Sequence, residues 1–529
     1  MDMDMESTNT PSEDPFNILD FIFADLANEM TIVDFTTPGN PYTSVNPDWP
    51  DQRATAAGSH EMADSASSSY AMPHSTNTIS SAGATRNSTE QLAASAMVSQ
   101  ALPLDPATSQ AMARVPEFLS TKQSIYTCFH YIVNSARALP NSPLCYAILS
   151  WVYAYLARLS AGQACSRDEH YTAASDGIRC LVAELTTTAS AHDIWKPTNV
   201  SEQLSSYLSA TFFVCQYDLM EGNFSAFLTR ISDTKSLFRR LWVDRTLPGP
   251  VESRVLIWLA FLELRFYFLG GERYAPADGQ TDLMTLLEET KALSALRQSR
   301  TKKSTLSKVF PDGLPQEEAE EDLRKERCRA RFDDIMCYLA NLRRFMAWDR
   351  MSSQRVNIDT ALLNELRDAK VQALHADLRR LQAECELAIP SINTLPASNQ
   401  TIDSITFHTL TVRTLRSCAT IMFRRATDPE SRTGSECQDA VADIVRIARL
   451  LRQAKYLRSP RSTIWPLPLY IAGIESTDGV YQDWILDYMN ELGSWGSHIQ
   501  EAAHALQRII NHQENTGSRA TLTDETMHS

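Results

Sequence analysis

Apolar residues recur at every third or fourth position from about residue 115 to about residue 512, with few interruptions. This spacing puts them on one face of an α-helix, whereas a half-buried strand alternates apolar and polar residues. No stretch bounded by turn signals alternates convincingly in that way. The sequence therefore predicts an all-α body at residues 114–515, a large bundle of antiparallel helix pairs.

Individual helices can be placed within this body from their apolar faces. Residues 224–243 predict an amphipathic helix, and residues 251–269 are apolar nearly all round, as in a central buried helix. Residues 270–318 contain several glycines and prolines, so they predict a loop-rich insertion with one short helix around 283–296. Longer helices are expected at roughly 316–350, 358–388, 402–426 and 436–456.

The stretch 464–476, IWPLPLYIAGIES, stands out as an apolar run with two prolines. It is too short to cross a membrane, and both prolines fit the first turn of a helix, where backbone N–H groups have no partner. Gly473 permits close approach of another helix, and residues 476–478 offer caps for the helix that follows. The face expected on that next helix comprises Val480, Trp484, Ile485, Tyr488 and Met489.

Acidic residues are concentrated at the N-terminus. Residues 1–120 hold sixteen Asp and Glu against three Lys and Arg, which accounts for −13 of the chain's net charge of −15. The remaining residues are nearly neutral, and a body without clustered basic charge does not attract nucleic acid from a distance. Contact with DNA is therefore expected only locally or through another module.

Three further segments lie outside the predicted body. Residues 53–113 are dominated by Ser, Ala and Thr and predict a disordered linker, because they cannot bury enough apolar surface to offset their ordering entropy. Residues 516–529 predict a disordered tail. Residues 1–52 form an acidic-hydrophobic head.

The head carries large apolar residues three or four positions apart, interleaved with Asp and Glu. These residues are Phe16, Leu19, Phe23, Leu26 and Met30. Such alternation suits an activation segment that stays solvated alone and folds into an apolar groove on a partner. The alternative is an N-terminal helix docked on the chain's own body. The linker that follows favours partner binding.

Membrane insertion and secretion are not expected. No apolar run approaches about 20 residues, and the first residues, MDMDME, are acidic where a secretory signal is basic. The ten cysteines are scattered, mostly among apolar neighbours. They are therefore expected to be buried free thiols in a reducing compartment.

Motifs for catalysis and metal binding are absent or weak. Phosphate-binding glycine loops, zinc-protease and nucleophile-elbow signatures and Cys-x-x-Cys pairs do not occur. Residues 232–235 match S-x-x-K, but without companion motifs they are expected on an exposed helix face. Glu501 and His504 share a helix face, and a solvated pair is favoured over a metal edge. The sequence predicts no catalytic residue, cofactor or metal.

Two basic clusters are candidates for nuclear import signals. The first lies in the predicted insertion and comprises Arg297, Arg300, Lys302 and Lys303. The second occupies residues 324–331. Both clusters have the alternative of being solvated helix faces, and nearby Glu residues make helical ion pairing a sufficient explanation for the second.

The order of helices resembles a known family. The segments at 203–241 (QLSSYLSATFFVCQYDLMEGNFSAFLTRISDTKSLFRRL), 255–266 (VLIWLAFLELRF) and 465–509, which begins WPLPLYIAGIES, are similar to the fungal-specific transcription factor regulatory domain. The resemblance covers about residues 120–512. In this family the all-helical domain follows a six-cysteine zinc cluster that binds DNA. This sequence lacks the cluster's Cys-x2-Cys-x6-Cys spacing, and its first cysteine is Cys128.

The resemblance implies a nuclear transcriptional regulator of fungal type that controls a metabolic gene cluster, such as one for a secondary metabolite. It would act through the transcription machinery, through a DNA-bound regulator, or through a zinc cluster encoded upstream. A homodimer is a further partner option. The rival interpretation is an α-helical scaffold without a transcriptional role, and an enzyme is the third and most distant.

Overall fold

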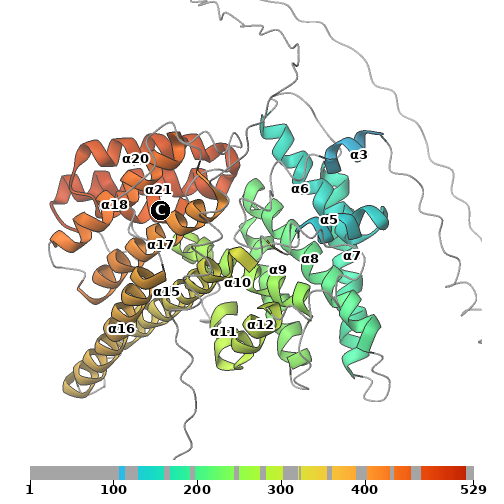
Figure 1. Cartoon of the computed structure of the whole chain (residues 1–529), viewed down its shortest axis with the longest axis horizontal. Helices are drawn as coiled ribbons and strands as arrows, with labels where there is room; N and C mark the ends of the chain where they lie inside the picture. Colours follow the sequence, from blue (N-terminus) through green and yellow to red (C-terminus); the bar gives the residue numbers. More distant parts are fainter. Residues whose placement is uncertain are drawn as a thin grey trace, which may run out of the picture. The chain divides into compact units, whose positions relative to one another are not determined.

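The computed structural model describes residues 106–113, 129–159, 167–190, 197–242, 249–274, 281–301, 320, 323–353, 360–388, 402–428, 434–453 and 466–519. The chain divides into two compact units, residues 1–87 and 88–529, and every described residue belongs to the second. The regular elements in these residues are helices, without a strand among them (Figure 1). The predicted all-α class is therefore confirmed for the body.

The first half of the body is arranged around the buried helix α10. Its elements are α3 (Pro106–Ala113), α5 (Phe129–Ala138), α6 (Pro143–Leu159), α7 (Arg167–Ser190), α8 (Pro197–Glu221), α9 (Phe224–Trp242), α10 (Pro250–Phe268), the 3-10 turn η1 (Gly271–Tyr274), α11 (Leu283–Glu289) and α12 (Ala292–Thr301). Helix α10 begins with a proline, as helices tolerate, and contacts α8, α9, α11, α12 and η1. Nearly all its side chains are buried, which confirms the predicted central helix.

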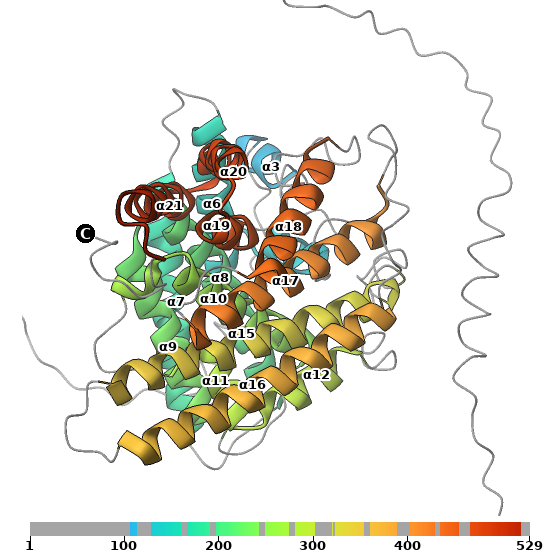
Figure 2. The same ribbon diagram turned by 90° about the vertical axis from the view of Figure 1, so that its left-hand side faces the viewer.

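The second half of the body consists of longer helices and a compact C-terminal group. Its elements are α15 (Glu326–Ser353), α16 (Thr360–Ala388), α17 (Ser404–Thr427), α18 (Ser435–Gln453), α19 (Pro466–Glu475), α20 (Gly479–Leu492), the 3-10 turn η3 (Gly493–Trp495) and α21 (Ser497–Thr516). Helices α15 and α16 run side by side in both views (Figure 1 and Figure 2). Helix α19 contacts α17, α18, α20 and α21, so it is the core of the C-terminal group.

The predicted apolar run at 464–476 contains helix α19. Pro466 and Pro468 lie in its first turn, as expected. A Cβ on Gly473 would lie 2.8 Å from the Leu506 side chain, which shows that α21 approaches the α19 backbone closely. The Asp478 carboxylate accepts from the N–H of Val480 (2.8 Å) and caps α20. The side chain of Val480 is 70% exposed, however, so its predicted place on the apolar face was wrong.

The N-terminal end of α21 abuts the C-terminal end of α8. The ring Nδ1 of His498 lies 3.0 Å from the carbonyl oxygen of Leu219, and Arg158 donates to the carbonyl oxygen of Met220. Both carbonyls belong to the last turn of α8, which has no intrahelical donors for them. Gly496 precedes α21 with φ 156°, and a Cβ there would lie 2.9 Å from the Met220 Cα. This contact joins the two halves of the body.

Several boundaries differ from the sequence expectation. Residues 106–113, assigned to the disordered linker, form α3, because Met112 is buried and its carbonyl accepts from Arg137 (3.1 Å). The single helix expected around 283–296 is split into α11 and α12 at Lys291, whose φ is 57°. The predicted head lies outside the described residues. No helix among the described residues is long and apolar enough to cross a bilayer.

Candidate functional site

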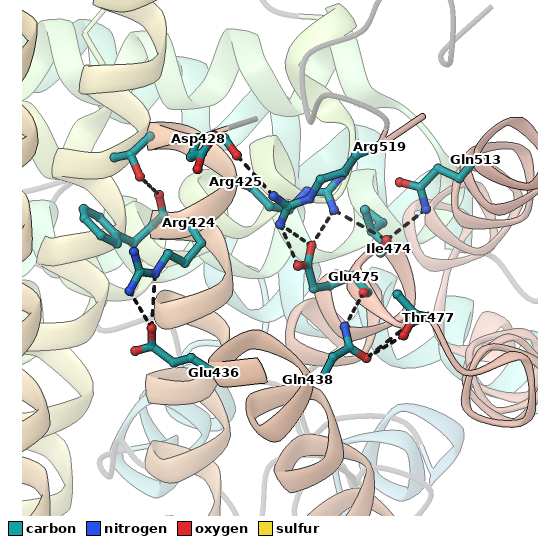
Figure 3. A network of polar contacts seen from close by, with 12 residues as sticks. Arg424, Arg425, Asp428, Glu436, Gln438, Ile474, Glu475, Thr477, Gln513 and Arg519 are labelled. Atoms are coloured by element: carbon teal, nitrogen blue, oxygen red, sulfur yellow. Dashed lines mark hydrogen bonds and ion pairs between the residues drawn. The ribbon is translucent and has the colours of Figure 1, made fainter. Parts of the chain in front are cut away.

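A buried carboxylate, that of Glu475, lies at the last residue of α19 and is the centre of a polar network (Figure 3). Its Oε2 accepts from the Arg425 guanidinium of α17 at 2.6 Å, and both side chains are almost fully buried. Arg519, which follows α21, donates to both carboxylate oxygens at 2.6 Å. We call Arg425, Glu475 and Arg519 the Glu475 cluster.

Amide side chains extend this cluster to two more helices. Gln438 of α18 donates to the carbonyl oxygen of Glu475 (3.0 Å) and accepts from the hydroxyl of Thr477 (3.2 Å). Gln513 of α21 donates to the carbonyl oxygen of Ile474 (3.0 Å). These carbonyls end α19, so side chains from α18 and α21 complete its C-terminal turn. The network therefore joins α17, α18, α19 and α21.

The electrostatics of the cluster favour a structural role for the ion pairs. Burial lowers the pKa of Arg425, and the charge of Glu475 opposes that shift. An arginine stays charged under all ordinary conditions, so the carboxylate must remain in place to compensate the buried guanidinium. Arg519 makes a further contact with the carbonyl oxygen of Asp428 (3.2 Å), which holds the segment after α21 against the end of α17.

A second buried carboxylate, Glu263, lies on the central helix α10. Its Oε1 accepts from Lys235 Nζ of α9 (2.7 Å) and from the Tyr267 hydroxyl (3.1 Å). Its Oε2 accepts from the backbone N–H of Leu283, at the start of α11 (2.7 Å). Burial raises the pKa of Glu263, and Lys235 opposes that rise. This carboxylate ties α9, α10 and α11 together.

This arrangement corrects the expectation for the S-x-x-K match at residues 232–235. Lys235 and Thr234 are buried, so the match does not lie on an exposed helix face. The Thr234 hydroxyl is 3.0 Å from the Tyr207 hydroxyl, and Lys235 forms an ion pair with Glu263. A lysine held as an ion pair at 2.7 Å is positioned to balance charge between helices.

Two more carboxylates, those of Asp282 and Asp218, form ion pairs that connect neighbouring helices. Asp282 caps α11 and accepts from Arg343 of α15 (3.0 Å), whose guanidinium lies 3.8 Å from the centre of the Tyr267 ring. Asp218 of α8 accepts from Arg230 of α9 (2.8 Å) and from the hydroxyl of Tyr171 on α7 (2.7 Å). Burial raises the pKa of Asp218, and the Arg230 charge opposes it.

One hollow in the described body lies between these helices and α21. It has room for about one water molecule. Aromatic rings of α9, α10 and η1 and two polar residues of α21 line it: Phe224, Phe266, Tyr274, His498 and Glu501. The Tyr274 hydroxyl donates to Glu501 (3.0 Å), so the carboxylate considered for a metal edge with His504 accepts a hydrogen bond. Among the described residues, no group of three or more potential metal ligands comes together.

The structure describes two of the four residues of the first basic cluster, Arg297 and Arg300. Arg297 lies on α12, where it pairs with Asp333 (3.3 Å) and Asp334 of α15. Its guanidinium also donates to the carbonyl oxygen of Ala330 (3.0 Å). Arg300 belongs to α12 as well, and Lys302 and Lys303 lie outside the described residues. The role of this cluster in nuclear import stays a prediction, with Arg297 engaged in packing α12 on α15.

The second basic cluster, residues 324–331, spans the start of helix α15. Lys325 and Arg329 are buried, so the solvated-face interpretation fails for them. Arg331 forms ion pairs with Asp334 and with Glu384 of α16. The predicted head residues, Phe16 to Met30, lie outside the described residues. Among the described cysteines most are buried, as expected, whereas Cys180 is exposed.

Sequence reasoning missed the buried carboxylates. Glu475 is the one charged residue of α19, and Glu263 lies between large apolar residues of α10, so a charge within a buried apolar face was the available signal. Their partners, Arg425 and Lys235, lie 50 and 28 positions away. Spacing along one helix cannot identify pairs at that separation.

Comparison with known proteins gives one result for most of the body. No curated protein and no solved structure matches the chain. A family model described as a fungal specific transcription factor domain matches residues 132–518, from α5 to the residue before Arg519. The matched region includes the Glu475 and Glu263 carboxylates and covers well over half of the chain. The chain therefore belongs to the family of fungal-specific transcription factor domains, as the helix order indicates.

Proposed function

We propose that this protein acts in the nucleus as a transcriptional activator, with a regulatory helical body and an acidic head that recruits transcription proteins. The observation that carries the proposal is the family match over residues 132–518, which spans almost the entire described body. A fungal transcriptional regulator is the function of that family at the coarse level. The partner-based mechanism is our extension of it.

The head supplies the chemistry for recruitment. Large apolar residues at helical spacing can enter a groove on a partner, while the interleaved carboxylates keep the free segment solvated. The body supplies a platform whose helices are joined by buried ion pairs, including the Glu475 cluster. We propose that the head contacts the transcription machinery, while a DNA-bound regulator or a zinc-cluster module brings the protein to its promoters.

Fusion of residues 1–52 to a heterologous DNA-binding module tests this activation role. The wild-type head should activate a reporter, and Phe23→Ala with Leu26→Ala should reduce activation about tenfold, because hot-spot side chains carry most of the binding energy. Tyr42→Ala with Val45→Ala is the matched control, since it removes two apolar side chains from the same fragment outside the acidic-hydrophobic segment. An inactive wild-type head, or equal losses in both double variants, would favour the scaffold interpretation.

Nuclear import can be tested with a fluorescent fusion of the full chain. We expect Arg300→Ala with Lys302→Ala and Lys303→Ala to shift the protein toward the cytoplasm. Arg297→Ala is the informative companion, because it disrupts the ion pairs with Asp333 and Asp334 and leaves the rest of the basic run intact. Exclusion of the wild-type protein from nuclei under all conditions would contradict the proposal.

The proposed targets are the genes of one metabolic cluster, such as a cluster for a secondary metabolite. This part of the proposal extends the coarser function that the family match supports, that of a fungal transcriptional regulator. Transcript profiling after gene deletion should show lower expression of several adjacent genes. Changes scattered across the genome without a contiguous group would contradict it.

A further inference from the structure

Helix α16 presents a long face on which no other described helix packs. Its inner residues pack against α15 and α17, and Figure 1 shows it on the outside of the helical body. On the opposite side, Leu362 is 61% exposed and Leu366 is 47% exposed. The exposed line continues through four alanines, Ala369, Ala373, Ala376 and Ala383, with Arg380 between the last two. We call the two leucines and the four alanines the α16 outer face.

The spacing of this face suits packing against another helix. Residues 362, 366, 369, 373, 376, 380 and 383 follow the alternating four-three pattern of a heptad seam. The seam spans about 33 Å at the usual rise per residue. Alanine at its centre allows two helix axes to approach to about 8 Å.

The charged residues next to the α16 outer face indicate which partner it fits. Glu365 lies near the N-terminal end, whereas Arg379 and Arg380 lie near the C-terminal end, and all three are exposed. Arg380 also forms an ion pair with Asp377 one turn away. Two copies of α16 packed antiparallel about position 373 would bring Glu365 of each copy beside Arg379 and Arg380 of the other. Parallel copies would instead place like charges together.

The sizes of the side chains fit the same arrangement. In the antiparallel pair Leu362 lies opposite Ala383, and Ala369 lies opposite Ala376, so large residues meet small ones. Leu366 lies opposite the aliphatic stem of Arg380. An isologous twofold interface requires a face that is complementary to a second copy of itself, and this face is complementary in both charge and side-chain size.

We infer that the α16 outer face mediates homodimerisation through antiparallel packing of α16 from two chains. The interface is a single helix pair, which places it at the small end of specific interfaces, and we expect a dissociation constant of about micromolar. This inference stands apart from the proposed transcriptional role, because it concerns only assembly.

Sedimentation velocity of the full chain over about a hundredfold concentration range around micromolar tests the inference. The wild type should change from monomer to dimer. Ala376→Glu should weaken dimerisation about tenfold or more, because it places bulk and charge at the closest approach of the helices. Ala183→Glu, the same substitution at an exposed position of α7, is the matched control and should dimerise like the wild type.

A charge swap identifies the arrangement. Glu365→Arg alone, and Arg379→Glu with Arg380→Glu, should each weaken the dimer, because like charges then meet. The triple variant should restore it, because both sides of each contact are reversed. A monomeric wild type would overturn the inference, including one whose α16 is covered by the acidic head or by another protein. Equal behaviour of Ala376→Glu and Ala183→Glu, or no rescue in the triple variant, would also overturn it.

Discussion

The carboxylate of Glu475 and the guanidinium of Arg425 lie 2.6 Å apart between α19 and α17, and both side chains are withdrawn from solvent. Breaking such a pair costs much more than replacing both partners, because the remaining charge is left buried. Arg519 shares the same carboxylate, so removal of Glu475 would strand two guanidiniums.

Glu475→Ala should therefore lower the free energy of unfolding by about 3 to 5 kcal/mol. Chemical denaturation followed by circular dichroism measures this loss. Glu436→Ala is the matched control, because its ion pair with Arg424 is about half exposed on both sides. It should cost less than about 1 kcal/mol. Similar losses in the two variants would show that the Glu475 cluster is not the stabilising centre.

Lys235→Ala should also destabilise the protein strongly, by about 3 to 5 kcal/mol, because Glu263 would then be buried beside the Tyr267 hydroxyl without its cation. The neighbouring Ser232→Ala tests the catalytic interpretation of the S-x-x-K match. If the Ser232→Ala protein folded normally but lost function as the Lys235→Ala protein does, this result would contradict a purely structural role for Lys235.

Gly496→Ala should destabilise the junction between α8 and α21 by about 1 to 3 kcal/mol. The backbone at Gly496 has φ 156° and ψ 157°, and the added Cβ would meet the Cα of Met220, which cannot rotate away. Gly479→Ala is the control, since a Cβ there meets nothing within 4 Å. Thermal unfolding of both variants measures the difference, and equal midpoints would contradict the prediction.

Asp443 provides a test of pH dependence. Burial alone would raise its pKa, but hydrogen bonds from Arg413 (2.7 and 2.8 Å) and Arg446 (2.7 Å) outweigh burial and hold the pKa below its ordinary value of 3.8. A carboxyl with a lowered folded-state pKa adds stability above its unfolded-state pKa and loses it as the pH falls through the folded-state pKa.

Asp443→Asn should consequently be less stable than the wild type at neutral pH, and the gap should narrow as the pH falls below about 3.8. Urea unfolding at stepped pH measures both curves. Asp176→Asn, which alters an exposed ion pair with Arg179 on α7, should show little difference at any pH. A gap that stays constant into the acid range would contradict the assignment.

The sequence predicted those elements whose signal lies within one helix. The apolar character of 251–269 indicated the buried α10, and Pro466 with Pro468 indicated the start of α19. Capping of α20 by residues 476–478 was likewise local, and Asp478 provides it. Each of these features depends on residues a few positions apart, where periodicity and capping rules apply.

The polar interior could not be predicted in that way. Glu475 contacts Arg425 and Arg519 only after three separate elements have packed together. The sequence predicts an exposed Lys235, because the partner that buries it, Glu263, lies on another helix, α10. Val480 fails for the opposite reason, since helical spacing assigns a face but does not say where that face ends. Tertiary contacts decide both cases.

The junction between α8 and α21 sets the order in which the chain can reach its final form. The His498 ring contacts the Leu219 carbonyl oxygen across 279 positions of sequence. Because synthesis proceeds from the N-terminus, the C-terminal end of α8 cannot contact α21 until nearly the whole chain has been made. The early helices are therefore synthesised with this surface uncovered, and a product that terminates before α21 would keep it uncovered.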